Sequence, residues 1–233
     1  MKGSIIQPLF FPWAGYFHLI SRSEIFIFLD DVQFKKTWCA RNKILINGKK
    51  KFINMPLLKQ SQKSLIKERR FINFQNDYAN FKKKIFYSLK ANDFFSNIEE
   101  LFSDINEDEI SKNLSDFNIF FIKKICNLMN IKTSFHKSSE FNVKKKRSEK
   151  LIELCKINDI KQYLSPVGSK NYMSEDKFEI LFNGKIQFNK FFYKEYNQNL
   201  NNKFIDFLSI LDLISNMSWK QSFNYIYCHE VQY

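Results

Sequence analysis

A continuous apolar run, Ile25–Phe28, limits the fold classes open to this chain. Its four side chains are all large and apolar, which is typical of a strand covered on both faces, as in a parallel sheet. The patterns predict a strand at Glu24–Leu29, an earlier strand at Ser4–Gln7, and a helix at Trp13–Arg22 between them. Strand, helix and strand in this order form one right-handed crossover unit of an α/β fold.

The rest of the chain predicts further elements of the same fold around two insertions. An Asn47-Gly48 turn predicts a β-hairpin, and helical spacing of apolar residues recurs between residues 76 and 130. Leu65–Ile72 is ambiguous and could form another strand. The predicted hairpin strands are 43–46 and 51–55, the later strands 131–135, 162–164 and 185–188, and the helices 77–91, 93–105, 115–129, 144–158 and 175–182. For 205–215 the pattern leaves open a helix or a strand–helix step.

These elements predict a Rossmann-like α/β fold with a mostly parallel sheet. We expect an N-terminal α/β core with a hairpin insertion over residues 1–75 and a helical subdomain over 76–130. A second α/β part over 131–233 would complete the same domain. The length of 233 residues fits one domain, or one and a half.

Polar residues follow both predicted N-terminal strands. Gln7 ends the first, and Asp30 and Asp31 follow the second directly. Ligands of open α/β sheets bind outside the carboxyl ends of the strands, so both segments are expected to face one crevice. One carboxylate could act as general base or metal ligand, whereas the other could simply cap the next turn. We therefore name Asp30 and Asp31 as catalytic candidates.

Three further segments are candidates for ligand binding. The strand-to-helix loop holds Pro12 and Gly15, where the free N–H groups of a helix start bind anions well; the alternative is a tight structural turn. Around Trp38, basic residues could hold a phosphate while the ring stacks; the alternative is a solvated basic face. Ser165–Tyr172 offers hydroxyls and N–H donors, or is an ordinary turn. The predicted substrate-binding residues are Gln7, Pro12, Trp13, Gly15, Tyr16, Gln33, Lys36, Trp38, Arg41, Asn42, Lys43, Ser165, Gly168, Ser169, Tyr172 and Asp212.

The charge, the cysteines and the lengths of the apolar runs exclude some classes of protein but do not identify the function. The net charge of +13 suggests an anionic partner, although a Lys-rich surface from AT-rich codons would give the same value. The basic run 144–147 is interpreted as a solvated surface. Four distant cysteines argue against a zinc ribbon and a disulfide framework, and no metal site is predicted. No apolar run reaches the roughly 18 residues of a membrane span, so we expect a cytoplasmic protein.

The segment 5–46 resembles the WbqC-like family of bacterial surface-polysaccharide gene clusters. The residues that carry the resemblance are Gln7-Pro8, Phe11-Pro12, Gly15-Tyr16-Phe17, Leu19-Ile20, Asp30-Asp31-Val32-Gln33-Phe34, Trp38 and Arg41-Asn42-Lys43-Ile44. The sequence departs from the family pattern at Ala40, where an Asn is usual, and at Ser169, which replaces a Gly. A second, weaker similarity is to nucleotidyltransferase-type Rossmann-like folds, but Trp13 and Tyr16 stand where those enzymes carry catalytic histidines.

The resemblance implies a role in O-antigen or capsule biosynthesis. Our leading hypothesis is a transferase that adds an acyl or aminoacyl group to the amine of a nucleotide-linked amino sugar. A glycosyltransferase of the same pathway is the first alternative, although a clear Asp-x-Asp motif is missing; a noncatalytic nucleotide-sugar binding protein is the second. Nucleic acid is not expected as a partner, a homo-oligomer is left open, and no cofactor is assigned.

Overall fold

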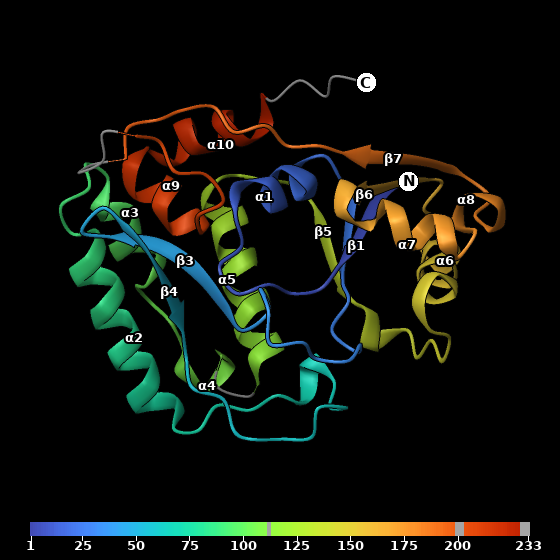
Figure 1. Ribbon diagram of the computed structural model, residues 1–233, viewed down its shortest axis with the longest axis horizontal. Coiled ribbons are helices and arrows are strands. Elements are labelled where there is room, and N and C mark those ends of the chain that lie inside the picture. Colours follow the sequence, from blue (N-terminus) through green and yellow to red (C-terminus); the bar gives the residue numbers. More distant parts are fainter. Residues whose placement is uncertain (111–112, 199–202, 229–233) are drawn as a thin grey trace.

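A five-stranded parallel sheet forms the centre of the protein in a computed structural model, which describes residues 1–110, 113–198 and 203–228 (Figure 1). The strands are β1 (Lys2–Ile6), β2 (Ile25–Phe28), β5 (Ser134–Lys137), β6 (Gln162–Pro166) and β7 (Lys185–Asn189). They lie in the order β5-β2-β1-β6-β7, and every neighbouring pair is parallel. The predicted α/β fold with a parallel sheet is therefore confirmed.

Helices cover both faces of the sheet, as the apolar run in β2 predicts. Phe26 and Phe28 belong to a large apolar core on one face, which also contains residues of α1 (Ala14–Ser21). Ile25 and Ile27 belong to a smaller core on the other face. That smaller core is formed with α6 (Arg147–Ile157), α7 (Lys170–Glu175) and α8 (Phe178–Leu181). Successive side chains of a strand point to opposite faces, so all four residues of β2 are buried.

The chain between β2 and β5 forms the insertions. A hairpin of β3 (Arg41–Ile46) and β4 (Lys49–Asn54) comes first, and its turn is the Asn47-Gly48 pair, both at positive φ. The helices that follow are α2 (Phe74–Leu89), α3 (Phe95–Leu101), α4 (Glu107–Ile110) and α5 (Leu114–Leu128). In Figure 1 the hairpin and α2 lie together at one side of the sheet, beside α5.

The structure defines two local features that the sequence patterns left open. Leu65–Ile72 is not a strand: it contains the 3-10 turn η1 (Ile66–Glu68), because the Glu68 carboxylate accepts a hydrogen bond from Leu65 N at 2.7 Å and closes the chain on itself. The N-cap of α5 is Asn113, whose side chain accepts a hydrogen bond from Asp116 N at 2.9 Å, as is usual for an N-cap asparagine.

The C-terminal part closes over the N-terminal helix. α9 (Ile210–Asn216) and α10 (Trp219–Tyr227) lie on the same side of the sheet as α1 (Figure 1). The stretch left open at 205–215 is helical only from Ile210, and residues 205–209 form neither strand nor helix. Short 3-10 turns, η2 (Ser138–Glu140) and η3 (Val167–Ser169), follow β5 and β6. Among the described residues, no helix is both long and apolar enough to cross a membrane.

Candidate functional site

A crevice of about 1010 Å³ opens at the carboxyl ends of the strands. The chain runs from β1 outward to β2 and β5, then returns to β6 on the other side of β1. The loops after β1 and β6 therefore leave the sheet in opposite directions, which opens a gap between them, the usual ligand site of an open α/β sheet. Its lining includes Gln7 after β1, Asp31 after β2 and Gly168 after β6.

Asp30, the other catalytic candidate, is buried and does not line the crevice. It is 2% exposed, and its carboxylate accepts hydrogen bonds from Ser138 Oγ at 3.1 Å, Ser139 N at 3.0 Å and Ser139 Oγ at 2.7 Å. These hydrogen bonds join the end of β2 to the turn after β5, so Asp30 fixes the positions of the two neighbouring loops relative to each other.

Asp31 lies on the wall of the crevice. Its Oδ1 accepts a hydrogen bond from Ser138 Oγ, and its Oδ2 lies 2.7 Å from Lys150 Nζ of α6. The side chain of Asp31 is 12% exposed and that of Lys150 is 7% exposed. Lys150 Nζ also donates to the carbonyl of Val143 at 3.3 Å. The structure thus fixes a carboxylate and an ammonium group side by side at the ligand-facing surface.

Buried side chains fix the position of the loop after β1. Tyr16 OH donates to the carbonyl of Gln7 at 3.0 Å, and Cys39 Sγ lies 3.5 Å from Gln7 Oε1. Asn118 of α5 donates to the carbonyls of Pro8, at 3.0 Å, and Cys39, at 2.8 Å. This bridge fixes the two loops that carry Gln7 and Asp31.

The loop after β6 forms the opposite wall. Ser165 and Ser169 are buried and share a hydrogen bond between their hydroxyls, and Ser169 Oγ also donates to the carbonyl of Pro166 at 2.6 Å. Ser169, Gly168 and Tyr172 line the crevice. The side chain of Tyr172 is half-exposed, which makes its ring available to a bound ligand.

Among the predicted binding residues around the start of α1, Pro12, Gly15 and Tyr16 are buried, and Trp13 is half-buried against the large core. Pro12 is buried, and its carbonyl accepts a hydrogen bond from Ile210 N at 2.8 Å. At Gly15, an added Cβ would meet Trp13 Nε1 at 2.6 Å and Phe191 Cβ at 3.0 Å. The close approach that this glycine permits is therefore made by the protein's own side chains.

Asn42 and Asp212 are also enclosed, at different places. Asn42 is 1% exposed and donates to the carbonyl of Phe11 at 2.7 Å. Asp212 lies in α9 and accepts hydrogen bonds from Tyr196 OH at 2.6 Å and Gln198 Nε2 at 3.1 Å. It lines a separate cavity of about 140 Å³ beside the hairpin turn. Burial raises the pKa of Asp212 to about 6, against hydrogen bonds that lower it.

The remaining predicted residues lie at the mouth of the crevice or on the neighbouring hairpin. Gln33 and Trp38 line the crevice, with Trp38 42% exposed. Lys36 is exposed near them but is not part of the lining. Arg41 and Lys43 lie in β3 and do not line the crevice. The structure therefore gathers Gln7, Asp31, Gln33, Trp38, Gly168, Ser169 and Tyr172 around one cavity.

Comparison with known proteins identifies the family. The model of the WbqC-like protein family matches residues 7–223, a stretch that includes all but the first few and last residues. The chain belongs to the WbqC-like protein family. It is also 29% identical over 232 residues to the uncharacterized protein Rv1507c of Mycobacterium tuberculosis (strain ATCC 25618 / H37Rv), covering 98% of this chain and 99% of that protein. No solved structure matches the chain.

The crevice of this WbqC-like protein also contains basic residues that the sequence interpretation assigned to solvent. Lys145, Lys146 and Arg147, at the start of α6, line it together with Lys35. Lys145 pairs with Glu153 at 3.2 Å, and Arg147 pairs with Asp176. Their position between β5 and α6 is the signal that could have identified them, since loops that follow strands of a parallel sheet meet at the ligand-binding edge.

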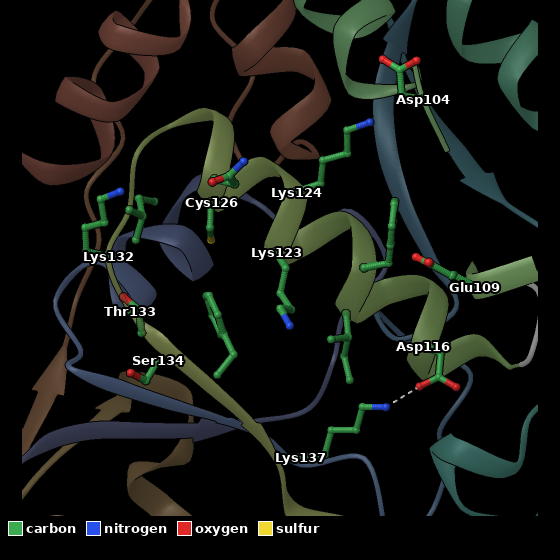
Figure 2. A pocket seen from close by; sticks show the side chains of 15 residues that line it. Asp104, Glu109, Asp116, Lys123, Lys124, Cys126, Lys132, Thr133, Ser134 and Lys137 are labelled. Carbon is green, nitrogen blue, oxygen red and sulfur yellow. Dashed lines mark hydrogen bonds and ion pairs between the residues drawn. The ribbon is translucent and has the colours of Figure 1, made fainter. Parts of the chain in front are cut away.

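A second hollow of the WbqC-like protein, the edge groove, lies beside α5 and the outermost strand β5. Its volume is about 980 Å³. Figure 2 shows Lys123 and Lys124 reaching from α5, and Lys137 directed at Asp116. The ion pair between Lys137 and Asp116 is 2.7 Å long, and Lys124 Nζ donates to the carbonyl of Ser103. Because this groove lies away from the loops after β1 and β6, the crevice is the stronger candidate site.

The part of the chain described here contains no cluster of three or more His, Cys, Asp or Glu placed to hold a metal ion. The polar groups of the crevice are one carboxylate, several cations, hydroxyls and two amides. Such a set can bind an anionic, polyhydroxylated ligand and can accept a proton beside it.

Proposed function

We propose that this WbqC-like protein is a transferase that acylates the amine of a nucleotide-linked amino sugar in surface-polysaccharide biosynthesis. The observation that carries the proposal is the position of Asp31: a carboxylate on the wall of a basic crevice at the β1/β6 switch point. The proposal has three parts, which are the binding of the diphosphate, the placing of the sugar, and the transfer of a proton.

Cations on two sides of the crevice support binding of the diphosphate. Lys35 follows β2 and Lys146 precedes α6, and both line the crevice. Within the described residues, neither of these two lysines has an ion-pair partner, whereas Lys145 and Arg147 do. Lysine ammonium groups bind phosphate as point charges, so Lys35 and Lys146 would hold the two phosphates.

Aromatic rings support binding of the base and the sugar. Trp38 and Tyr172 line the crevice from different walls and are 42% and 37% exposed. Exposed rings of this kind stack on planar bases and on the apolar faces of sugars. Gln7, at the end of β1, offers an amide to sugar hydroxyls.

Asp31 is the candidate proton acceptor in the transfer. In the proposed step the neutral amine attacks the carbonyl carbon of an activated acyl or aminoacyl ester or thioester. A carbon–nitrogen bond forms, the bond to the leaving oxygen or sulfur breaks, the amine proton passes to Asp31, and the leaving group takes up a proton. Lys150 and Ser138 hold the Asp31 carboxylate, and Asp30 acts as a positioning residue through Ser138 and Ser139.

The test is incubation of the purified protein with UDP-, dTDP- and GDP-linked amino sugars and acyl thioesters, followed by mass spectrometry of the sugar. We expect an acylated amine with at least one pair. Asp31→Asn should lower kcat by about 10²–10⁴-fold, the range of a general base. Lys146→Gln should raise the KM for the nucleotide sugar about tenfold, as for the loss of one charge-assisted hydrogen bond.

Lys144→Gln is the matched control, because Lys144 is exposed in the same basic run but does not line the crevice. It should leave both constants unchanged. Transfer of the sugar to a lipid acceptor with its amine still free would overturn the proposal in favour of a glycosyltransferase. Binding of nucleotide sugars with no turnover of any pair would overturn it in favour of a binding protein.

A further inference from the structure

A row of alternating cations and aromatic rings runs along the outer face of the β3–β4 hairpin. We call it the cation–aromatic ladder and define it as Arg41, Phe52, Lys43 and Trp38. Arg41 Cζ lies 4.4 Å from the centre of the Phe52 ring, and Lys43 Nζ lies 5.0 Å from the same ring and 5.8 Å from Trp38. Lys43 and Phe52 are directly opposite each other in the hairpin register, so they share one face.

Both rings of the ladder are partly exposed to solvent. Phe52 is 41% exposed and Trp38 is 42% exposed. Ile44 and Ile53 of the same hairpin are, in contrast, fully buried in the core. Part of each ring of the ladder is therefore accessible to a ligand.

The charges of the ladder are also open. Lys50 is on the same hairpin face, opposite Leu45, and pairs with Asp206 at 3.7 Å. Arg41 and Lys43, in contrast, form no ion pair with any carboxylate of the described residues. Their contacts with ring faces orient the cations without neutralising them. The ladder is therefore a positively charged aromatic surface prepared for an anionic, planar ligand.

The ladder leads into the crevice. Trp38 belongs to both, because it lines the crevice and also contacts Lys43. Its backbone is fixed there, since the Trp38 carbonyl accepts a hydrogen bond from Phe10 N at 2.8 Å. A ligand held on the ladder can therefore extend past Trp38 toward the site of transfer.

We propose that the ladder binds the phosphorylated nucleoside of the acyl donor. The base would stack on Phe52 or Trp38, and Arg41 and Lys43 would bind its phosphates, with the guanidinium able to form a bidentate fork. The proposal rests on the proposed function, in which the crevice holds the nucleotide sugar. Two rings and two open cations, ending at the Lys50–Asp206 pair, fit one nucleotide rather than a strand of nucleic acid.

The test measures binding without turnover. The probe is adenosine 3′,5′-bisphosphate, the phosphorylated nucleoside of coenzyme A, titrated by calorimetry into the full chain. Arg41→Gln and Phe52→Leu should each weaken its binding by about tenfold or more, the loss expected for one charged hydrogen bond or one stacked base. Arg41→Lys should weaken it less, because the charge is kept and only the fork is lost.

Two controls separate the ladder from the crevice and from general charge. Lys51→Gln removes an exposed cation on the opposite face of the hairpin, where Lys51 lies across from Ile44 in the strand register. This variant should leave bisphosphate binding unchanged. Lys146→Gln should weaken nucleotide-sugar binding only. Thermal unfolding of each variant shows whether it is folded. If Arg41→Gln does not fold, Arg41→Lys still tests the role of the guanidinium group.

The possible results are distinct from those of the proposed function. Bisphosphate binding that survives both ladder variants, or no binding by a protein that does acylate amino sugars, would overturn the ladder and leave the proposed function standing. Ladder-dependent binding by a protein that never acylates a sugar would support the nucleotide site while the proposed function fails. Affinity that rises steeply with the length of an oligonucleotide would overturn the ladder in favour of nucleic acid.

Discussion

Asp31 Oδ2 and Lys150 Nζ lie 2.7 Å apart, with both side chains almost enclosed. Asp31 follows β2, whereas Lys150 comes from α6, more than a hundred residues later in the chain. The contact therefore joins the second strand of the sheet to the helix that precedes β6. It fixes the distance between two walls of the crevice, and so it ties the stability of the fold to the shape of the candidate site.

Breaking this pair from either side should destabilise the protein. Lys150→Met leaves the Asp31 carboxylate with only Ser138, and we expect a loss of about 2–3 kcal/mol, somewhat below the range for fully buried pairs because the crevice admits water. The double variant Asp31→Asn/Lys150→Met should lose clearly less free energy of unfolding than the two single variants lose in sum. Urea unfolding of the four proteins measures this coupling, and strict additivity would contradict the pair as a structural link.

Sequence patterns predicted the centre of this fold well because its elements are encoded in short segments of the chain. The apolar run of β2 predicted a strand covered on both faces, and Asp30 and Asp31 at its end predicted polar groups at the carboxyl edge. Both follow from properties of short segments, which are independent of distant parts of the chain. The fold class could therefore be read from residues that are adjacent in sequence.

The elements that sequence patterns did not place depend on distant or competing contacts. Lys150 reaches the crevice from within α6 only because β6 returns beside β1, a choice of topology that no local pattern records. Asn113 and Ser115 are both residue types that favour the N-cap position. The sequence alone therefore does not decide between them, and the folded structure has Asn113 as the N-cap of α5. The hydrogen bond from Leu65 N to Glu68 forms a turn where apolar residues alone suggested a strand.

Two glycines that the sequence assigned to ligand binding, Gly15 in the packed interior and Gly168 on the wall of the crevice, should respond oppositely to substitution by alanine. At Gly15 a new Cβ would meet Trp13 Nε1 at 2.6 Å and Phe191 Cβ at 3.0 Å, so Gly15→Ala should destabilise by about 1–3 kcal/mol through overpacking. At Gly168 nothing lies within 4 Å of the new Cβ. Gly168→Ala should therefore be neutral or stabilise by up to about 1 kcal/mol through the unfolded state.

Thermal unfolding of the two variants checks this prediction, and each serves as the other's control. A stable Gly15→Ala protein would show that Trp13 and Phe191 can move apart, and would contradict the role of this glycine in close packing. A marked loss of stability in Gly168→Ala would show that the loop after β6 is more tightly constrained than its open surroundings indicate.

Asn118 should be a stability residue, although it lies beneath a candidate site. Its side-chain amide donates to the carbonyls of Pro8 and Cys39, so Asn118→Leu would leave two buried acceptors without a donor. We expect a loss of about 2–4 kcal/mol, since each unsatisfied buried group costs roughly 1–3 kcal/mol. Asn127→Leu, at an exposed position of the same helix, should change stability by less than about 0.5 kcal/mol. Equal effects of the two substitutions in urea unfolding would refute the bridging role.

Asp212 should make the stability of the protein depend on pH in a direction opposite to that of most carboxylates. Burial raises its pKa from 3.8 to about 6, so between about pH 4 and pH 6 the folded state holds a proton that the unfolded state has lost. Stability therefore falls as pH rises through this window. Above it, the buried charge costs on the order of 3 kcal/mol, at about 1.4 kcal/mol for each pKa unit.

Asp212→Asn removes this titration while keeping an oxygen that can accept from Tyr196 OH and Gln198 Nε2, the two groups that donate to the aspartate. Other carboxylates titrate in the same range, so the quantity to measure is the difference in unfolding free energy between the two proteins from pH 4 to pH 7. That difference should shift in favour of the asparagine variant as pH rises, and level off above pH 6. A constant difference across the range would show that Asp212 ionises normally in the folded protein.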